Sequence, residues 1–343
     1  MLTPNFEITI GANIFTYVMN FNINENADLF TRTASIFLPQ KFYENSMNNI
    51  FDLIAIGDTV EIKTGFYPNL QTRFKGYVSK RVPNSPLEVQ CEDESFIYKQ
   101  TILEPLTLEN TTLGDFIGAI YSGKTEIFEP DRKIGTWRIA KSTTFLKVLD
   151  NLRQTFGLSA FWDNDGVLYI DKQLDELSEL KGAFYYDTVQ ANILDISNMT
   201  FQEAAEFNQV VKGISLSEDL GTDGKPKEPI TVYSYFDTKG KIKTTDQYNA
   251  FGNINEFKLP YLTKDELTKL CEIRLQNINF TGYRGTFKTW GEPIVNVNDD
   301  LEIYNNRQKE MQGRYRVKGV TINGGLNGYY QEIEVSKKTG EIN

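Results

Sequence analysis

Hydrophobic and polar residues alternate along the first hundred positions. Residues 6–10 read Phe-Glu-Ile-Thr-Ile. The same two-residue period recurs at 33–38, 60–62 and 87–91. Because successive side chains of a strand point to opposite faces, this period predicts strands with one buried and one polar face. Turn residues separate these runs, so we expect a β-barrel or sandwich over residues 1–104.

Helical spacing replaces this alternation after about residue 105. Leu113, Phe116, Ile117 and Ile120 form an apolar stripe that predicts a helix ending before Gly123. A second stripe comprises Phe145, Leu146, Leu149, Leu152 and Phe156. Ser142 or Thr143 can cap this helix, and Gly157 suits its C-terminal end. We expect a small α/β module over residues 105–183.

The strand pattern returns over residues 184–343. Thr263 and Glu266 have the spacing of a capping box, which predicts a helix to about residue 277. Residues 217–229 are poor in apolar side chains and rich in turn formers, as is typical of a loop. We therefore expect a second β-barrel here with helical and loop insertions.

A strand–turn–strand signature near the start of the chain recurs near its end. Residues 56–62 read Ile-Gly-Asp-Thr-Val-Glu-Ile, and residues 297–303 read Val-Asn-Asp-Asp-Leu-Glu-Ile. A Lys-Gly pair follows each copy. The signature places Asp58 with Asp299 and Gly76 with Gly319, and predicts two related barrels on one chain. We expect both glycines to be needed for barrel closure or assembly.

Composition narrows the possible functions. The 343-residue chain contains no histidine, which excludes imidazole bases and His-containing catalytic triads or zinc sites. Its formal net charge of −10 disfavours binding to nucleic acid. Cys91 and Cys271 are far apart, so we expect two reduced, buried thiols. No membrane-spanning run and no signal peptide are evident, so we expect the protein to be made and used without export through the general secretory pathway.

Three patterns suggest other chemistry. Asp163-Asn164-Asp165-Gly166 is rich in oxygen ligands, but its glycine comes too early for a calcium loop, so a hairpin turn is favoured. Carboxylate pairs such as Glu92 with Glu94, or Asp299 with Asp300, leave a glycan hydrolase open as an alternative. A carbohydrate-binding tail module is a further alternative, because aromatic residues make up 13% of the chain.

Several segments resemble one family, the phage tail baseplate hub proteins known as late-control D, which are similar to the hub part of type VI secretion spike proteins. The resemblance rests on the turn at Gly57-Asp58, the run 74–78, the helix and hairpin of residues 143–171, and the segments 285–293, 313–317 and 328–330. Asn298 stands where the family commonly has glycine, and asparagine tolerates the positive φ that such a turn needs.

The resemblance implies a mainly β fold, with two tube-like barrels flanking a small α/β module. It implies a homotrimer whose six barrels form a pseudo-sixfold ring in the baseplate of a virion, and a protein that is made in the host cytoplasm. Its implied partners are a hexameric tail tube protein, a trimeric spike or needle protein and a tape-measure protein. We expect a structural role without enzymatic activity. We expect no catalytic, cofactor-binding or metal-ligating residues, no cofactor and no stable binding to nucleic acid.

Overall fold

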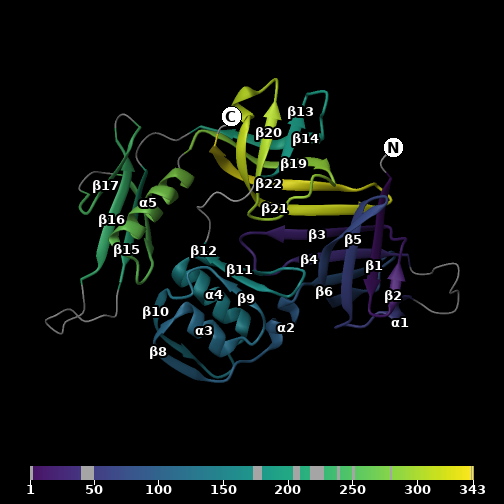
Figure 1. The fold of residues 1–343 in the computed structure, drawn as a ribbon, viewed down its shortest axis with the longest axis horizontal. Helices are drawn as coiled ribbons and strands as arrows, with labels where there is room; N and C mark the ends of the chain where they lie inside the picture. The colour runs from purple at the N-terminus through teal and green to yellow at the C-terminus, as the bar shows by residue number, and fades with distance from the viewer. Residues whose placement is uncertain are drawn as a thin grey trace.

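A computed structural model describes residues 3–39, 50–172, 180–203, 209–216, 228–237, 240–248, 252–278, 280–340 and 342. Four parts are visible in Figure 1: a barrel at the right, a second barrel at the top, a helix-containing module at the bottom and a smaller sheet with one helix at the left. None of the described helices is long and apolar enough to cross a membrane.

The first barrel is built from the N-terminal strands. These are β1 (Pro4–Ile10), β2 (Asn13–Phe15), β3 (Asn20–Asn26), β4 (Thr33–Leu38), β5 (Thr59–Phe66), β6 (Asn69–Val82) and β7 (Leu87–Glu92), with the short helix α1 (Ile50–Leu53) before β5. Their hydrogen-bonded order is β3-β4-β7-β6-β5-β1-β2. The buried positions of β4 alternate along the strand, as the sequence predicted.

The second barrel uses strands from the C-terminal half. These are β13 (Leu180–Tyr186), β14 (Ile193–Gln202), β19 (Gly282–Trp290), β20 (Asp300–Asn305), β21 (Gly313–Gly325) and β22 (Tyr330–Gly340), with a 3-10 turn at Lys309–Met311. Pairing gives the order β14-β19-β22-β21-β20-β13. With β3, β4, β7, β6, β5 and β1 as counterparts, the order is the same in both barrels. One strand differs in direction, because β1 is antiparallel to β5 whereas β13 is parallel to β20.

The two barrels are joined edge to edge. β21 pairs with β3 in antiparallel register from Gly319 opposite Asn26 to Gly325 opposite Asn20. This ladder makes a single thirteen-stranded sheet of the two barrels, seen in Figure 1 where yellow β21 lies beside purple β3. Their buried apolar side chains form one cluster that includes Phe21, Phe74 and Phe287.

The repeated turn is the same in both barrels. In the first, the Asp58 carboxylate accepts the Ala55 N–H at 2.7 Å, and Val78 N–H donates to the Asp58 carbonyl at 2.9 Å. In the second, the Asp299 carboxylate accepts the Asn296 N–H at 2.7 Å, and Val317 N–H donates to the Asp299 carbonyl at 2.9 Å. Asp58 and Asp299 are therefore equivalent.

Positive backbone angles complete the match between the turns. Gly57 has φ +91° and Asn298 has φ +74°. Asparagine is among the few residues other than glycine that adopt this region readily, so the expectation for Asn298 is confirmed.

The predicted equivalence of Gly76 and Gly319 is wrong. Val78 and Val317 make the same hydrogen bonds to the repeated turn and are therefore equivalent. Gly76 comes two residues before Val78, whereas Gly319 comes two residues after Val317. Gly76 lies opposite Val60 on β5, whereas Gly319 lies opposite Asn26 in the barrel junction. The two Lys-Gly pairs thus have different neighbours, and their likeness in sequence is coincidental.

The module between the barrels contains three helices and two small sheets. Its elements are α2 (Ser95–Gln100), β8 (Leu106–Thr112), α3 (Leu113–Ile120), β9 (Thr125–Ile127), β10 (Lys133–Ile139), α4 (Phe145–Phe156), β11 (Leu158–Trp162) and β12 (Leu168–Lys172). Gly157 ends α4 with φ +69°, as predicted. The N-cap position of α4 is Thr144 rather than Ser142 or Thr143.

A unit between β14 and β19 combines the predicted helical insertion with a sheet that was not predicted to be separate from the barrel. It comprises β15 (Gln209–Ser215), β16 (Ile230–Phe236), β17 (Ile242–Thr245), β18 (Asn253–Lys258) and α5 (Lys264–Ile278). Its strands form a separate sheet that packs against α5 around Val211, Leu267 and Cys271. The capping box is confirmed, since Thr263 N–H donates to the Glu266 carboxylate at 2.8 Å. Of the predicted loop, residues 217–227 lie outside the described residues.

Candidate functional site

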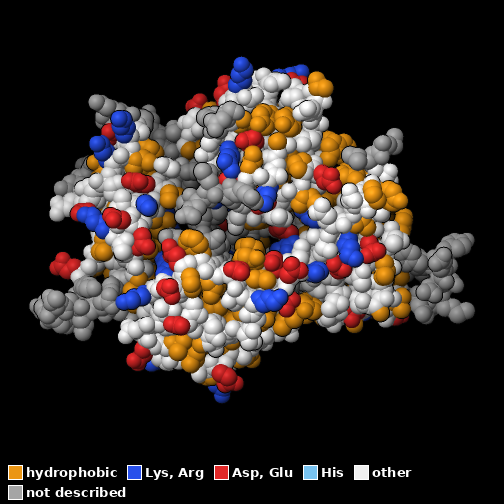
Figure 2. All heavy atoms as spheres, viewed as in Figure 1, with side chains coloured by type: hydrophobic (Ala, Val, Ile, Leu, Met, Phe, Trp, Pro, Cys, Tyr) orange, Lys and Arg blue, Asp and Glu red, His pale blue; other side chains and the backbone are white. Residues whose placement is uncertain are grey.

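A cavity of about 470 Å³ lies where the first barrel, the module and the second barrel meet. It is lined by Arg32 and Arg73 from the first barrel, Asn164 from the module, and Asn296 and Asp299 from the second barrel. In Figure 2 a hollow with acidic and basic side chains around it lies near the centre of the face shown. This junction is the candidate site because side chains from three parts of the chain meet there.

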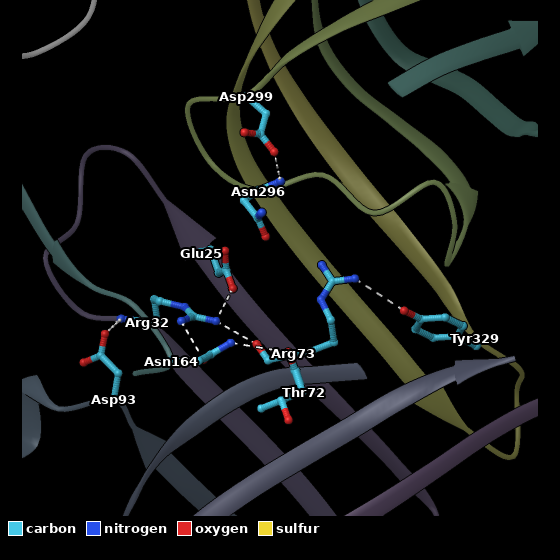
Figure 3. A network of polar contacts seen from close by, with 9 residues as sticks. All are labelled: Glu25, Arg32, Thr72, Arg73, Asp93, Asn164, Asn296, Asp299 and Tyr329. Carbon is cyan, nitrogen blue, oxygen red and sulfur yellow. Dashed lines mark hydrogen bonds and ion pairs between the residues drawn. The ribbon is translucent and has the colours of Figure 1, made fainter. Parts of the chain in front are cut away.

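Arg32 is the centre of the polar contacts in Figure 3. Its guanidinium forms an ion pair with Glu25, donates to the carbonyl of Arg73 at 2.7 Å, and donates to Oδ1 of Asn164 at 3.0 Å. Its backbone N–H donates to the Asp93 carboxylate at 2.9 Å. One side chain therefore connects β3, β6 and the module.

Asn164 is the module's contribution to this network. Besides accepting from Arg32, its amide donates to the carbonyl of Thr72 at 3.3 Å. The hairpin turn holds Asn164 in place, because the Asp163 carboxylate accepts the N–H groups of Asp165 and Val167 at 2.8 and 2.9 Å. The predicted turn between β11 and β12 is thus confirmed, and no metal-binding group of three His, Cys, Asp or Glu residues occurs in the described parts of the chain.

The second barrel contributes Tyr329 to the junction. Arg73 of the first barrel is buried, with an exposed fraction of 4%. Its guanidinium donates to the Tyr329 hydroxyl at 3.5 Å, as Figure 3 shows. The ring of Tyr329 also meets Phe66 of the first barrel edge to face, at a centroid distance of 5.4 Å. Burial raises the pKa of Tyr329, so the hydroxyl stays protonated at neutral pH.

Burial raises the pKa of two carboxyl groups near the junction, those of Asp93 and Asp299. Burial raises the pKa of Asp93 above its ordinary value, although N–H groups of Arg32 and Ser95 oppose this by stabilising the charged form. Burial likewise raises the pKa of Asp299, against the stabilising N–H of Asn296. Each of these acidic side chains accepts backbone N–H groups that fix a turn, which is a structural use of the carboxylate.

The carboxylate pairs considered for glycan hydrolysis are also occupied. Asp300 is fully buried and binds Arg316, with the Nε–Oδ1 distance at 2.9 Å. Glu92 forms an ion pair with Lys99. Burial raises the pKa of Tyr77, and the nearby negative charge of Glu94 raises it further. These contacts support packing and pairing of elements rather than acid–base chemistry.

Neither cysteine lines the cavity, whereas three aromatic residues of the module, Phe161, Trp162 and Tyr169, do. Cys91 and Cys271 are both free and buried, as expected, and burial raises the pKa of Cys271 to about 11. Trp162 is fully buried and stacks on Tyr98. Trp290 is half exposed at the end of β19.

Asn164→Ala should lower the free energy of unfolding by about 1–3 kcal/mol, because it removes a hydrogen bond to a charged group and leaves the Arg32 guanidinium without that acceptor. Urea denaturation would measure this. Asp165→Ala is the matched control in the same turn. Asp165 is exposed and its ion pair with Lys75 is long, at 3.9 Å, so the substitution should cost at most about 1 kcal/mol. Equal losses in both variants would contradict a bridging role for Asn164.

Comparison with known structures reveals the fold of this chain. It is similar to a tail protein from Neisseria meningitidis MC58, with 12% identity, TM-score 0.65, and coverage of 98% of this chain and 97% of that one. It is also similar to the 43 kDa tail protein of prophage MuSo2 from Shewanella oneidensis, with 12% identity, TM-score 0.66, and coverage of 98% of each chain.

A third likeness extends to secretion systems. An E. coli component of the type VI secretion system, itself described as structurally similar to the T4 bacteriophage tail proteins gp27 and gp5, matches at 9% identity and TM-score 0.54, over 97% of this chain and 77% of that one. No protein-family model matches the sequence, and a search of curated sequences finds no match either. At these identities the likeness establishes the fold: two related barrels around an α/β module, as in phage tail proteins.

Proposed function

We propose that this chain, which has the fold of phage tail proteins, is the structural baseplate hub of a phage tail or a related injection machine. The observation that carries the proposal is the edge-to-edge junction of two barrels with one strand order. Three copies of a chain with two similar barrels would place six similar units around a threefold axis. Such a ring suits contact with a hexameric tail tube on one side and a trimeric spike on the other.

The proposed role is non-enzymatic. The chain lacks histidine, and three of the four carboxylates considered above are engaged: Asp300 and Glu92 in ion pairs and Asp299 in a turn. The division into residues 1–104, 105–183 and 184–343 remains a prediction. The proposed partners are further copies of this chain, a tail tube protein, a spike or needle protein and a tape-measure protein. The proposed location is the baseplate of the virion, after synthesis in the host cytoplasm.

The charge of the assembly argues against stable DNA binding. Each chain carries a formal charge of −10, so three chains carry three times that value and would repel phosphate groups in the absence of a basic lumen. We propose that the ring of three chains encloses a passage, and that acidic, amide and hydroxyl side chains line it.

Light scattering on the purified protein, alone and with its spike, tests the hub proposal. We expect a species of three times the 39.3 kDa chain mass. A protein that stays monomeric under both conditions would contradict the proposal.

Addition of double-stranded DNA near physiological salt should leave the measured mass unchanged, and salt-sensitive binding at micromolar DNA would contradict the expected lumen.

A further inference from the structure

The two barrels can be aligned residue by residue through their cross-strand neighbours. In the first barrel, one row of neighbours runs through Val78, Cys91, Ala34 and Ile23. In the second, the equivalent row runs through Val317, Val335, Gly285 and Met199. The repeated turn fixes the start of each row, because Val78 and Val317 make the same hydrogen bonds to it. Ile23 on β3 is therefore the counterpart of Met199 on β14.

A bulge confirms this alignment one residue further along β6 and β21. Between Val78 and Lys80, the partner on β7 moves by only one residue, from Cys91 to Gln90. The partner on β22 does the same between Val317 and Gly319, moving from Val335 to Glu334. Because bulges reset the register of a strand, a shared bulge ties Lys80 to Gly319.

The barrel junction within the chain uses only one of two equivalent pairs of edges. It joins β21 of the second barrel to β3 of the first. The counterparts of these edges are the end of β6 and the whole of β14. They lie on different barrels (Figure 1) and do not pair with each other within the described chain.

β14 has the features of an edge strand that can pair with a strand of another chain. It is the terminal strand on its side of the large sheet and pairs only with β19 among the described strands. Most of its side chains are exposed, including Leu194 at 41% and Phe201 at 46%. Its counterpart β3, which is paired on both sides, buries every second side chain. Exposed edge strands with apolar side chains favour pairing with another chain.

We propose that the end of β6 in one copy of the chain pairs with β14 of the next copy, in the antiparallel register of the internal junction. This places Lys80 opposite Gln202, Arg81 opposite Phe201, and Val82 opposite Thr200. The inference rests on the proposed threefold assembly and specifies which strands form its contacts. A junction of this kind is heterologous, so repetition around a rotation axis closes a ring.

The intermolecular ladder is shorter than the internal one. β6 ends at Val82, and Pro83 follows without a backbone N–H to donate. The internal ladder instead continues along β21 to Gly325, where the nearest backbone of β3 is so close that a Cβ would lie 2.6 Å from Cα of Asn20. Subunits therefore meet through three or so residue pairs, whereas the barrels of one chain meet through seven.

Cysteine pairing tests the register. Directly opposed residues on antiparallel strands have Cα atoms roughly 4.5–5.5 Å apart, within the range that a disulfide spans. Val82 is partly buried and Thr200 is exposed. On mild oxidation, Val82→Cys with Thr200→Cys should produce covalent dimers and trimers on a non-reducing gel, and these should disappear on reduction. The native thiols are buried and do not compete.

Three controls make the result specific. Each single variant should remain uncrosslinked as a trimer of separable chains. Val82→Cys with Asn198→Cys moves the second thiol two residues along β14 and should crosslink at least about tenfold less. Thr321→Cys with Asn24→Cys places the pair in the internal junction, where the native side chains are 3.0 Å apart, and should form an intrachain bond without increasing the mass.

The outcomes separate this inference from the hub proposal. A threefold species that crosslinks through 82 and 200 supports both. A threefold species that crosslinks only in the shifted pair, or in neither pair, overturns the β6–β14 contact and leaves the hub proposal standing. A monomer that forms no crosslinked species overturns both.

Discussion

Asp300→Ala should lower the free energy of unfolding by about 3–5 kcal/mol, because it removes one member of a buried ion pair and leaves the other charge uncompensated. Asp300 is fully buried at the start of β20. It lies directly opposite Arg316 on β21, whose Nε is 2.9 Å from Oδ1, and a second arginine, Arg314, has its Nε 3.4 Å from Oδ2. Urea denaturation followed by circular dichroism would measure the change.

Asp150→Ala is the comparison for this variant. Asp150 forms a partly exposed ion pair with Arg153 on α4, at 2.8 Å, and its loss should cost at most about 1 kcal/mol. If Asp300→Ala were no more damaging than Asp150→Ala, the buried pair would contribute nothing beyond its desolvation cost.

Gly76→Ala should destabilise the first barrel by about 3 kcal/mol or more, at the upper end of the range for overpacking. A Cβ at Gly76 would lie 2.1 Å from the carbonyl oxygen of Glu92 and 2.9 Å from Cα of Asp93. Both are backbone atoms at the end of the adjoining strand β7, so the clash can be relieved only if β6 and β7 move apart. The melting temperature by circular dichroism, together with the oligomer mass, would report the damage.

Gly319→Ala provides the matched variant, because the same Lys-Gly pair occurs there in a different place. Its Cβ would lie 3.1 Å from the side-chain nitrogen of Asn26, an atom that can move. The sequence repeat predicted that both glycines are needed, but the wider spacing at Gly319 changes this expectation. We expect a change below about 1 kcal/mol there, since alanine also suits a strand interior slightly better than glycine. Similar losses in both variants would restore the equivalence of the two glycines that the hydrogen-bond pattern contradicts.

Local signals in the sequence predicted local structure well. The apolar stripe and Gly157 located α4, and the spacing of Thr263 and Glu266 located the start of α5. The repeated acidic turn was recognisable because its aspartate and its positive-φ residue are each required by the backbone of the turn. These features depend on residues only a few positions apart, so the chain sequence displays them directly.

Register was harder to predict. A Lys-Gly pair near each second strand suggested a match, but the match ignored where the bulges fall. The bulges at Ser79 and Lys318 are set by pairing with β7 and β22, which are not readable from β6 and β21 alone. The small sheet packed on α5 was not separated from the second barrel for a similar reason: its strands alternate with the same period as those of the barrel.

The polar junction was not predicted at all. Arg32 and Asn164 are separated by 132 positions, and Arg73 and Tyr329 by 256. Nothing in the sequence near an arginine shows which distant carbonyl or hydroxyl it will reach. The only available signal was the hairpin turn at 163–166, which located Asn164 in the turn between two strands without indicating its partner.

The junction between β3 and β21 also determines the order of events during synthesis. Asn24 and Thr321, hydrogen-bonded across it, are 297 positions apart. At a translation rate of roughly 5–20 residues per second, β3 leaves the ribosome about 15–60 s before its partner. During that interval one edge of β3 has no partner strand, and such edges promote aggregation. β3 reads Asn-Phe-Asn-Ile-Asn-Glu-Asn, so its side chains on the face away from the core are all asparagines, which keeps that face of the nascent strand hydrated until the last part of the chain emerges.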